Sequence, residues 1–226
     1  IGDVVFGFGP GLAEFALVSS DAVAKVPDSV PHDVAGCLGV AGLTAYQMLK
    51  KNGAFDGSDP KKILVIGASG GVGSLVVQIA KALCAPGTTI YGMCSARSSA
   101  FVQSLGATEI VDYSQPGFAL STALPLHSLD LVADCVSSPD DPNYVPEGLQ
   151  LIKREGKYVA INSASRVDWM KTFASKITGI NFFRGQYSFL LVDHAPADLL
   201  VIADLVATKK LVVHIPSRIG LNESEL

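Results

Sequence analysis

Glycine and other small residues cluster between Gly67 and Gly73, directly after the apolar run Ile63–Ile66. Glycine lets a backbone turn close tightly, and it lets N–H groups approach a ligand without a Cβ in the way. The first N–H groups of a following helix, together with the helix dipole, favour a bound anion. The pattern therefore predicts a cradle for the pyrophosphate of a dinucleotide. The alternative is a glycine-rich turn that only joins a strand to a helix.

The flanking residues favour the cradle. Position 68 is alanine where the strict Gly-x-Gly-x-x-Gly pattern needs glycine, while Gly70 and Gly73 fit the other two positions. A single apolar face at helical spacing follows, and residues 88–93 are typical of a second strand. That face comprises Val72, Leu75, Val76, Ile79, Ala80 and Leu83.

The residues after the second strand indicate which dinucleotide is bound. NAD-binding proteins of this design place a carboxylate there, which accepts a hydrogen bond from a ribose hydroxyl. The stretch Met93–Ser99 holds no carboxylate, but Ser95, Arg97 and Ser98 can donate to a 2′-phosphate. The sequence therefore favours NADP(H) over NAD(H). The alternative is that Arg97 is a solvated residue that opens the next helix.

Composition excludes several classes of partner. The 226 residues are 49% hydrophobic and 17% charged, and the formal charge of −4 gives no basic field for nucleic acid. The cysteines are dispersed in a way typical of buried reduced thiols, so neither a disulfide framework nor a metal site is expected. They are Cys37, Cys84, Cys94 and Cys135. The chain begins without Met in strand-like sequence, so we expect it to be part of a longer protein.

Strands and helices alternate after the cradle, which predicts an α/β fold with a doubly wound parallel sheet, preceded by a β-rich piece. The predicted strands are 4–8, 12–19, 22–26, 63–66, 88–93, 109–112, 128–135, 157–162, 187–192 and 211–215. The predicted helices are 32–38, 41–51, 72–83, 98–105, 146–153, 166–177 and 197–207.

Several separated blocks resemble one known family. They are Gly2-Asp3-Val4-Val5, Gly11-Leu12-Ala13-Glu14-Phe15, Val40-Ala41-Gly42-Leu43-Thr44-Ala45-Tyr46, Gly67–Gly73, and Leu105-Gly106-Ala107 with Val111-Asp112-Tyr113. Together they resemble the medium-chain dehydrogenase/reductase superfamily, in its zinc-free quinone oxidoreductase (zeta-crystallin-like) branch. Chloroplast-envelope quinone oxidoreductase homologues are similar also at Ala96-Arg97.

The resemblance implies a division of the chain and the absence of metal. Residues 1–33 would be a remnant of a GroES-like substrate domain, 34–209 the NADP-binding Rossmann domain, and 210–226 a return segment toward the substrate domain. The four-cysteine lobe of the zinc alcohol dehydrogenases is missing, so no structural zinc is expected. The absence of a catalytic metal is implied only by the resemblance to the zinc-free branch.

The resemblance also implies roles for particular residues. Ser69, Gly70, Gly71 and Val72 would hold the pyrophosphate; Ser95, Arg97 and Ser98 the 2′-phosphate; Tyr113 would pack near the adenosine. Thr44 would lie by the nicotinamide amide or the diphosphate, Cys135 and Val136 by the nicotinamide ribose, and Ile161 and Asn162 by the nicotinamide. Packing within their own elements is the alternative for Thr44 and Cys135.

These residues and the resemblance predict hydride transfer from NADPH to a quinone or an α,β-unsaturated carbonyl. Such acceptors need little acid–base help, and no catalytic dyad or triad is present. The catalytic residues are therefore unknown; Tyr46 is a candidate proton donor, with packing as its alternative.

A second hypothesis is a low-turnover NADPH-binding sensor, scaffold or membrane-associated protein. The aromatic and basic residues Trp169–Phe173, Lys176, Phe182, Phe183 and Arg184 suggest membrane contact, although packing on the sheet explains them too. The third hypothesis is that the protein is a zinc-dependent alcohol dehydrogenase. The family implies a homodimer through the strand Tyr187–Val192. We expect a cytoplasmic protein, with an organelle as the alternative.

Overall fold

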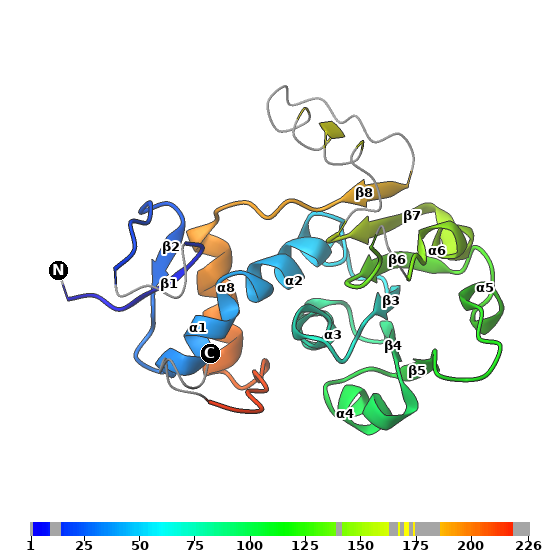
Figure 1. The fold of residues 1–226 in the computed structure, drawn as a ribbon, viewed down its shortest axis with the longest axis horizontal. Helices are drawn as coiled ribbons and strands as arrows, with labels where there is room; N and C mark the ends of the chain where they lie inside the picture. Colours follow the sequence, from blue (N-terminus) through cyan, green and yellow to red (C-terminus); the bar gives the residue numbers. More distant parts are fainter. Residues whose placement is uncertain are drawn as a thin grey trace, which may run out of the picture.

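The computed structural model describes residues 2–9, 15–138, 142–162, 167, 170–171, 174 and 186–218. Its centre is a six-stranded sheet in the order β5-β4-β3-β6-β7-β8, in which every neighbouring pair is parallel (Figure 1). The strands are β3 (Lys62–Ile66), β4 (Thr89–Cys94), β5 (Glu109–Asp112), β6 (Leu129–Asp134), β7 (Ile152–Ala160) and β8 (Tyr187–Phe189).

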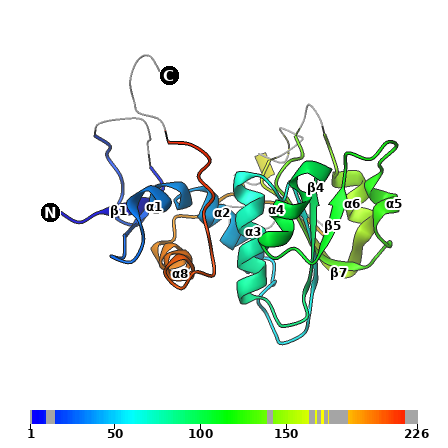
Figure 2. The same ribbon diagram turned by 90° about the horizontal axis from the view of Figure 1, so that it is seen from below.

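Both faces of this sheet are covered by helices, as the continuous apolar strands predict. Ile63 and Val65 of β3 face the core that includes α3 (Gly71–Leu83) and α4 (Ser99–Ser104). Leu64 and Ile66 face the opposite core, which includes α5 (Leu120–Ala123) and α6 (Val145–Leu151). Figure 2 shows α3 and α4 on one side of the sheet and α6 on the other. The predicted doubly wound α/β fold is confirmed.

A smaller group of elements lies beyond α2 (Ala41–Lys50), on the side away from the sheet (Figure 1). It contains the antiparallel pair β1 (Val5–Gly7) and β2 (Val23–Lys25), together with α1 (His32–Leu38) and α8 (Pro196–Ala207). The division of the chain at residues 33 and 209 stays a prediction.

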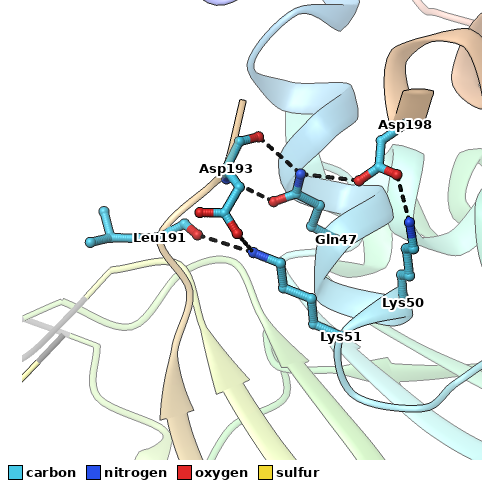
Figure 3. A network of polar contacts seen from close by, with 6 residues as sticks. All are labelled: Gln47, Lys50, Lys51, Leu191, Asp193 and Asp198. Atoms are coloured by element: carbon cyan, nitrogen blue, oxygen red, sulfur yellow. Dashed lines mark hydrogen bonds and ion pairs between the residues drawn. The ribbon is translucent and has the colours of Figure 1, made fainter. Parts of the chain in front are cut away.

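The segment that joins β8 to α8 is held against α2 by a polar network (Figure 3). The Gln47 amide accepts from Asp193 N at 2.9 Å and donates to Asp193 O at 3.0 Å and to Asp198 Oδ2 at 3.2 Å. Lys50 donates to the other Asp198 oxygen, and Lys51 contacts Asp193 and the Leu191 carbonyl. The network therefore ties the far end of the sheet to the smaller group of elements.

Some predicted elements differ from the structure. Residues 15–19 are not a strand, and residues 12–14 of that prediction lie outside the described residues. The predicted helix 166–177 and the aromatic–basic stretch from Trp169 onward lie almost entirely outside them as well. The predicted strand 187–192 shortens to β8, and β7 begins at Ile152, directly after α6, rather than at residue 157. The short helix α5 had no prediction.

The predicted strand 211–215 is an extended segment that joins no sheet. It crosses α3, where the Gln78 amide accepts from Val212 N at 2.8 Å and donates to Val212 O at 3.0 Å. A side-chain amide thus satisfies the backbone groups that a neighbouring strand would otherwise satisfy.

Candidate nucleotide site at the carboxyl edge of the sheet

The residues that follow the parallel strands meet at one edge of the sheet. Backbone hydrogen bonds continue past the strand ends, from Ala68 N to Met93 O at 3.0 Å and from Cys135 N to Ile66 O at 3.1 Å. Ile161 N donates likewise to Asp134 O at 3.1 Å. In open α/β sheets this edge is the usual position of a ligand crevice.

A pocket of about 680 Å³ lies at this edge. Its walls are mostly apolar, and the glycine turn forms one of them. The predicted site residues among its lining are Ser69, Gly70, Gly71, Val72, Tyr113, Cys135 and Val136; the remaining lining residues are Ala41, Ile66, Gly67, Gly73, Met93, Pro142 and Tyr144. The structure therefore brings the pyrophosphate, adenosine and ribose candidates of the sequence analysis around one cavity.

Close backbone packing explains the glycines of the turn. Gly67 has a φ of +77°, and a Cβ there would lie 2.4 Å from Val136 Cγ2. A Cβ at position 73 would lie 2.1 Å from the Gly67 carbonyl oxygen. Only glycine fits either position without a shift of the chain.

The start of α3 supplies the donors of the cradle. Gly70 N donates to Gly67 O at 3.0 Å, and Ser74 N donates to Gly70 O at 2.9 Å. The N–H groups of residues 71–73 lie in the first turn, where no helical carbonyl can accept from them. No side chain caps this end. With the helix dipole, these groups fit a phosphate of a dinucleotide.

Cys135 and Val136 form the part of the pocket wall that packs against Gly67 of the glycine turn. The Cys135 thiol lies 4.0 Å from Met48 Sδ, and burial together with the Asp134 charge raises the pKa of Cys135. The thiol is therefore protonated at neutral pH and is a poor nucleophile.

Ser95, Arg97 and Ser98 follow β4 but do not line the cavity itself. Arg97 is exposed, and the two serines are half-buried around the short 3₁₀ turn Ala96–Ser98. Asp112, a nearby carboxylate that sequence reasoning missed, accepts from Ser114 and Gln115, and these hydrogen bonds lower the pKa of Asp112. The Asp112 oxygens are thus already engaged by their own turn.

The remaining candidates also lie outside the lining. Thr44 Oγ1 donates to Val40 O at 2.8 Å within its own helix, and Tyr46 packs against Phe55 with ring centroids 5.6 Å apart. Both residues thus have a contact within the fold, and the roles expected of Thr44 and Tyr46 beside a cofactor or substrate stay predictions. Ile161 is half-buried and Asn162 is exposed, directly after β7.

Sequence reasoning missed part of the pocket wall. Ile66 and Met93 are the apolar residues at or next to the ends of β3 and β4, so a count of strand length would have found them. Tyr144 and Pro142 reach the pocket only because the chain after β6 folds back, and no local pattern predicts that return.

The described residues do not fit a bound zinc ion. Within the described ranges, no three His, Cys, Asp or Glu side chains lie close enough together to hold a metal. Each of the four cysteines is a free thiol. The described part of the chain also contains no helix long and apolar enough to span a membrane.

Comparison with known proteins finds similarity to proteins that are named dehydrogenases and oxidoreductases. A family profile described as "Zinc-binding dehydrogenase" matches residues 105–225. A chloroplast envelope quinone oxidoreductase homologue of Arabidopsis thaliana is 34% identical over 220 residues, which is 96% of this chain and 64% of the relative. A mitochondrial NAD(P)H oxidoreductase of Homo sapiens is 33% identical over 141 residues, covering 62% of this chain and 34% of that protein.

Among solved structures, the quinone oxidoreductase of Coxiella burnetii superposes with a TM-score of 0.74 at 25% identity. The match covers 96% of this chain and 64% of that structure. The chain therefore spans 64% of the length of the Arabidopsis relative and of the Coxiella structure, and it shares the fold of that structure along 96% of its own length.

Proposed function

Because the chain belongs to the zinc-binding dehydrogenase family of the medium-chain dehydrogenase/reductase superfamily, we propose that it binds NADP(H) at the carboxyl edge of its sheet and reduces a quinone or an α,β-unsaturated carbonyl. The observation that carries the proposal is the pocket whose walls are the glycine turn, Tyr113 and the Cys135–Val136 corner.

The start of α3 is the proposed pyrophosphate site. The N–H groups of Gly71, Val72 and Gly73 have no helical acceptor, and an added Cβ at Gly71 would meet nothing within 4 Å, so a phosphate can approach the backbone there. Tyr113, which is 45% exposed, offers an apolar face for the adenosine. A relative named as an NAD(P)H oxidoreductase supports this class of cofactor.

We assign the preference for NADP(H) over NAD(H) to the corner after β4. Arg97 is exposed there and carries the positive charge that a 2′-phosphate needs, with Ser95 and Ser98 on either side. Asp112 lies on the neighbouring strand, but its oxygens accept hydrogen bonds from Ser114 and Gln115. These hydrogen bonds use three of the roughly four acceptor positions of the Asp112 carboxylate, which leaves little capacity for a ribose hydroxyl.

When bound, NADPH supplies a hydride to an acceptor that is already electron-poor, so the protein need only orient the two molecules and exclude water. The apolar walls formed by Ala41, Met93 and Val136 suit that task. Because the described residues do not fit zinc, no step of the proposed reaction uses a metal.

The first test is a fluorescence titration of the chain with NADPH and NADH, followed by NADPH oxidation with a panel of quinones and enones. We expect tighter binding of NADPH than of NADH, and oxidation with at least one acceptor. Failure to bind either dinucleotide would contradict the cofactor assignment. Binding without oxidation by any acceptor would favour the low-turnover sensor or scaffold instead.

We also propose that the chain forms a homodimer at the β8 side of the sheet. Support comes from the topology, since β8 is the last strand in the sheet order of the described residues, and strands at a sheet edge readily pair with a second copy. Sedimentation equilibrium is the test, and a monomer mass at all concentrations would contradict it. Leu190 is 8% exposed and belongs to the core, so a charge placed there would test folding instead of pairing.

A further inference from the structure

A buried polar cluster lies behind the pocket wall and makes no contact with the cavity. It consists of Asp134 at the end of β6, Tyr158 on β7, and Ser137, whose exposed fractions are 1%, 0% and 3%. None of the three lines the pocket. Burying a polar group costs free energy unless the group is hydrogen-bonded, and a buried network whose members are all hydrogen-bonded makes its surroundings rigid. We therefore ask which part of the structure this cluster holds in place.

Asp134 determines the shape of the turn that follows β6. Its Oδ1 accepts from Val136 N and from Ser137 N, both at 2.9 Å. Its Oδ2 accepts from the Tyr158 hydroxyl at 2.5 Å. Both carboxylate oxygens are therefore bonded, and Tyr158 anchors the carboxylate from the neighbouring strand.

Ser137 connects the turn after β6 to the residue just before α6. Its Oγ accepts from Tyr144 N at 2.9 Å, which fixes the position where the chain returns to the pocket. Val136, held by Asp134, packs against Gly67 so closely that a Cβ at Gly67 would lie 2.4 Å from Val136 Cγ2. The cluster thus positions two pocket-lining residues, Val136 and Tyr144.

The ring of Tyr158 packs closely against Gly148 of α6. A Cβ at position 148 of α6 would lie 2.4 Å from Tyr158 Cε2, so the glycine there makes room for the ring. Burial and the neighbouring Asp134 charge raise the pKa of Tyr158, which keeps its hydroxyl a donor at any working pH.

We infer that Asp134, Tyr158 and Ser137 are positioning residues, which hold the wall formed by Val136 and Tyr144 and thereby set the affinity of the pocket for NADP(H). This inference rests on the proposed function for its cofactor. It assigns control of that affinity to a side chain on β7 that does not touch the cavity.

The test uses Tyr158→Phe and Ser137→Ala, with Tyr91→Phe as the matched control. Tyr91 is a buried tyrosine in the same apolar layer, and no hydrogen bond is found for its hydroxyl among the described residues. Two quantities are measured: hydrogen exchange at the amides of Val136, Ser137 and Tyr144, and the dissociation constant of NADPH. The exchange measurement needs no cofactor.

We expect Tyr158→Phe and Ser137→Ala to speed exchange at these amides and to raise the NADPH dissociation constant roughly tenfold. At saturating NADPH we expect kcat to fall by a smaller factor than the affinity does, because saturation restores the bound cofactor although Val136 holds it less firmly. Asp134→Asn should have a smaller effect than Asp134→Ala, since its amide oxygen can still accept from the N–H groups of Val136 and Ser137, whereas the Tyr158 hydroxyl loses its carboxylate acceptor. Asp134→Ala removes all three hydrogen bonds and should have the largest effect.

Unchanged exchange and unchanged NADPH affinity in Tyr158→Phe and Ser137→Ala would overturn the positioning role. If Tyr158→Phe fails to fold, Ser137→Ala decides. If the wild-type chain binds no NADPH, the proposed function fails, and the exchange measurement separately shows whether the cluster holds the loop. If Tyr91→Phe weakens NADPH binding and speeds exchange as much as Tyr158→Phe does, the effect would come from a general disturbance of the core. That result would overturn the inference.

Discussion

The carbonyl oxygen of Gly67 occupies the space that a Cβ on Gly73 would need, with 2.1 Å between the oxygen and that Cβ position. This contact packs the first turn of α3 onto the end of β3 and so holds the cradle closed. Gly71, two positions earlier, has nothing within 4 Å of an added Cβ.

Gly73→Ala should therefore destabilise the chain by ~1–3 kcal/mol, the usual cost of overpacking, because its obstacle is backbone that cannot rotate away. Gly71→Ala should leave stability unchanged or slightly raised, since alanine favours the helix. Denaturant unfolding of both variants is the measurement. Equal stability of the two would contradict the close packing of the turn.

Gln47→Leu should cost about 2 kcal/mol of unfolding free energy, because it removes three hydrogen bonds and leaves the buried Asp198 partly unsatisfied (Figure 3). Lys51→Met is the control. Its ion pair with Asp193 has side chains 37% and 49% exposed, so its loss should cost less than about 1 kcal/mol. If Lys51→Met lowers the free energy of unfolding more than Gln47→Leu does, the exposed ion pair would be the main contact that holds the segment between β8 and α8 against α2.

Gln78→Leu should free the segment after α8 from α3, because both backbone groups of Val212 lose their partner. We expect faster hydrogen exchange at Val212 N and a decrease of ~1–3 kcal/mol in the free energy of unfolding. Gln103→Leu, on the exposed side of α4, should change neither quantity. Slow exchange at Val212 in Gln78→Leu would indicate that other contacts hold the segment.

Arg97→Gln should raise the dissociation constant of NADPH by roughly tenfold or more and leave that of NADH nearly unchanged, since only NADPH carries the 2′-phosphate. Arg154→Gln is the matched control, because Arg154 is a surface arginine near the start of β7, away from the carboxyl edge. Parallel fluorescence titrations with both dinucleotides measure the effect. An equal loss for NADPH and NADH would contradict the assignment of Arg97.

The cysteines should differ in their rate of alkylation at neutral pH. Burial raises the pKa of Cys84 to about 11 and also raises the pKa of Cys135, so both hold very little thiolate. Cys37 is exposed and should react first. Mass spectrometry after brief iodoacetamide treatment shows the order. Early labelling of Cys135 would mean that its side of the pocket opens to solvent.

The alternation of strand and helix after residue 60 could be predicted because each element depends on its own neighbours. Val72, Leu75, Val76 and Ile79 repeat at helical spacing, and α3 runs from Gly71 to Leu83, close to the predicted range. The glycine turn is local as well, since its positive φ at Gly67 and its tight approach at Gly73 arise within seven residues.

The sequence by itself therefore determined the doubly wound sheet and the glycine turn between β3 and α3, because backbone preference and apolar spacing act over a few residues. Only the tertiary structure decided that Tyr144 lines the pocket while Thr44 and Tyr46 are not among its lining residues, and that Tyr158 hydrogen-bonds to Asp134 behind the wall. The extended segment at Val212 is the same case, since its partner Gln78 lies 134 residues away. Such contacts form between elements that are far apart in the sequence, so the residues next to each partner in the chain do not determine them.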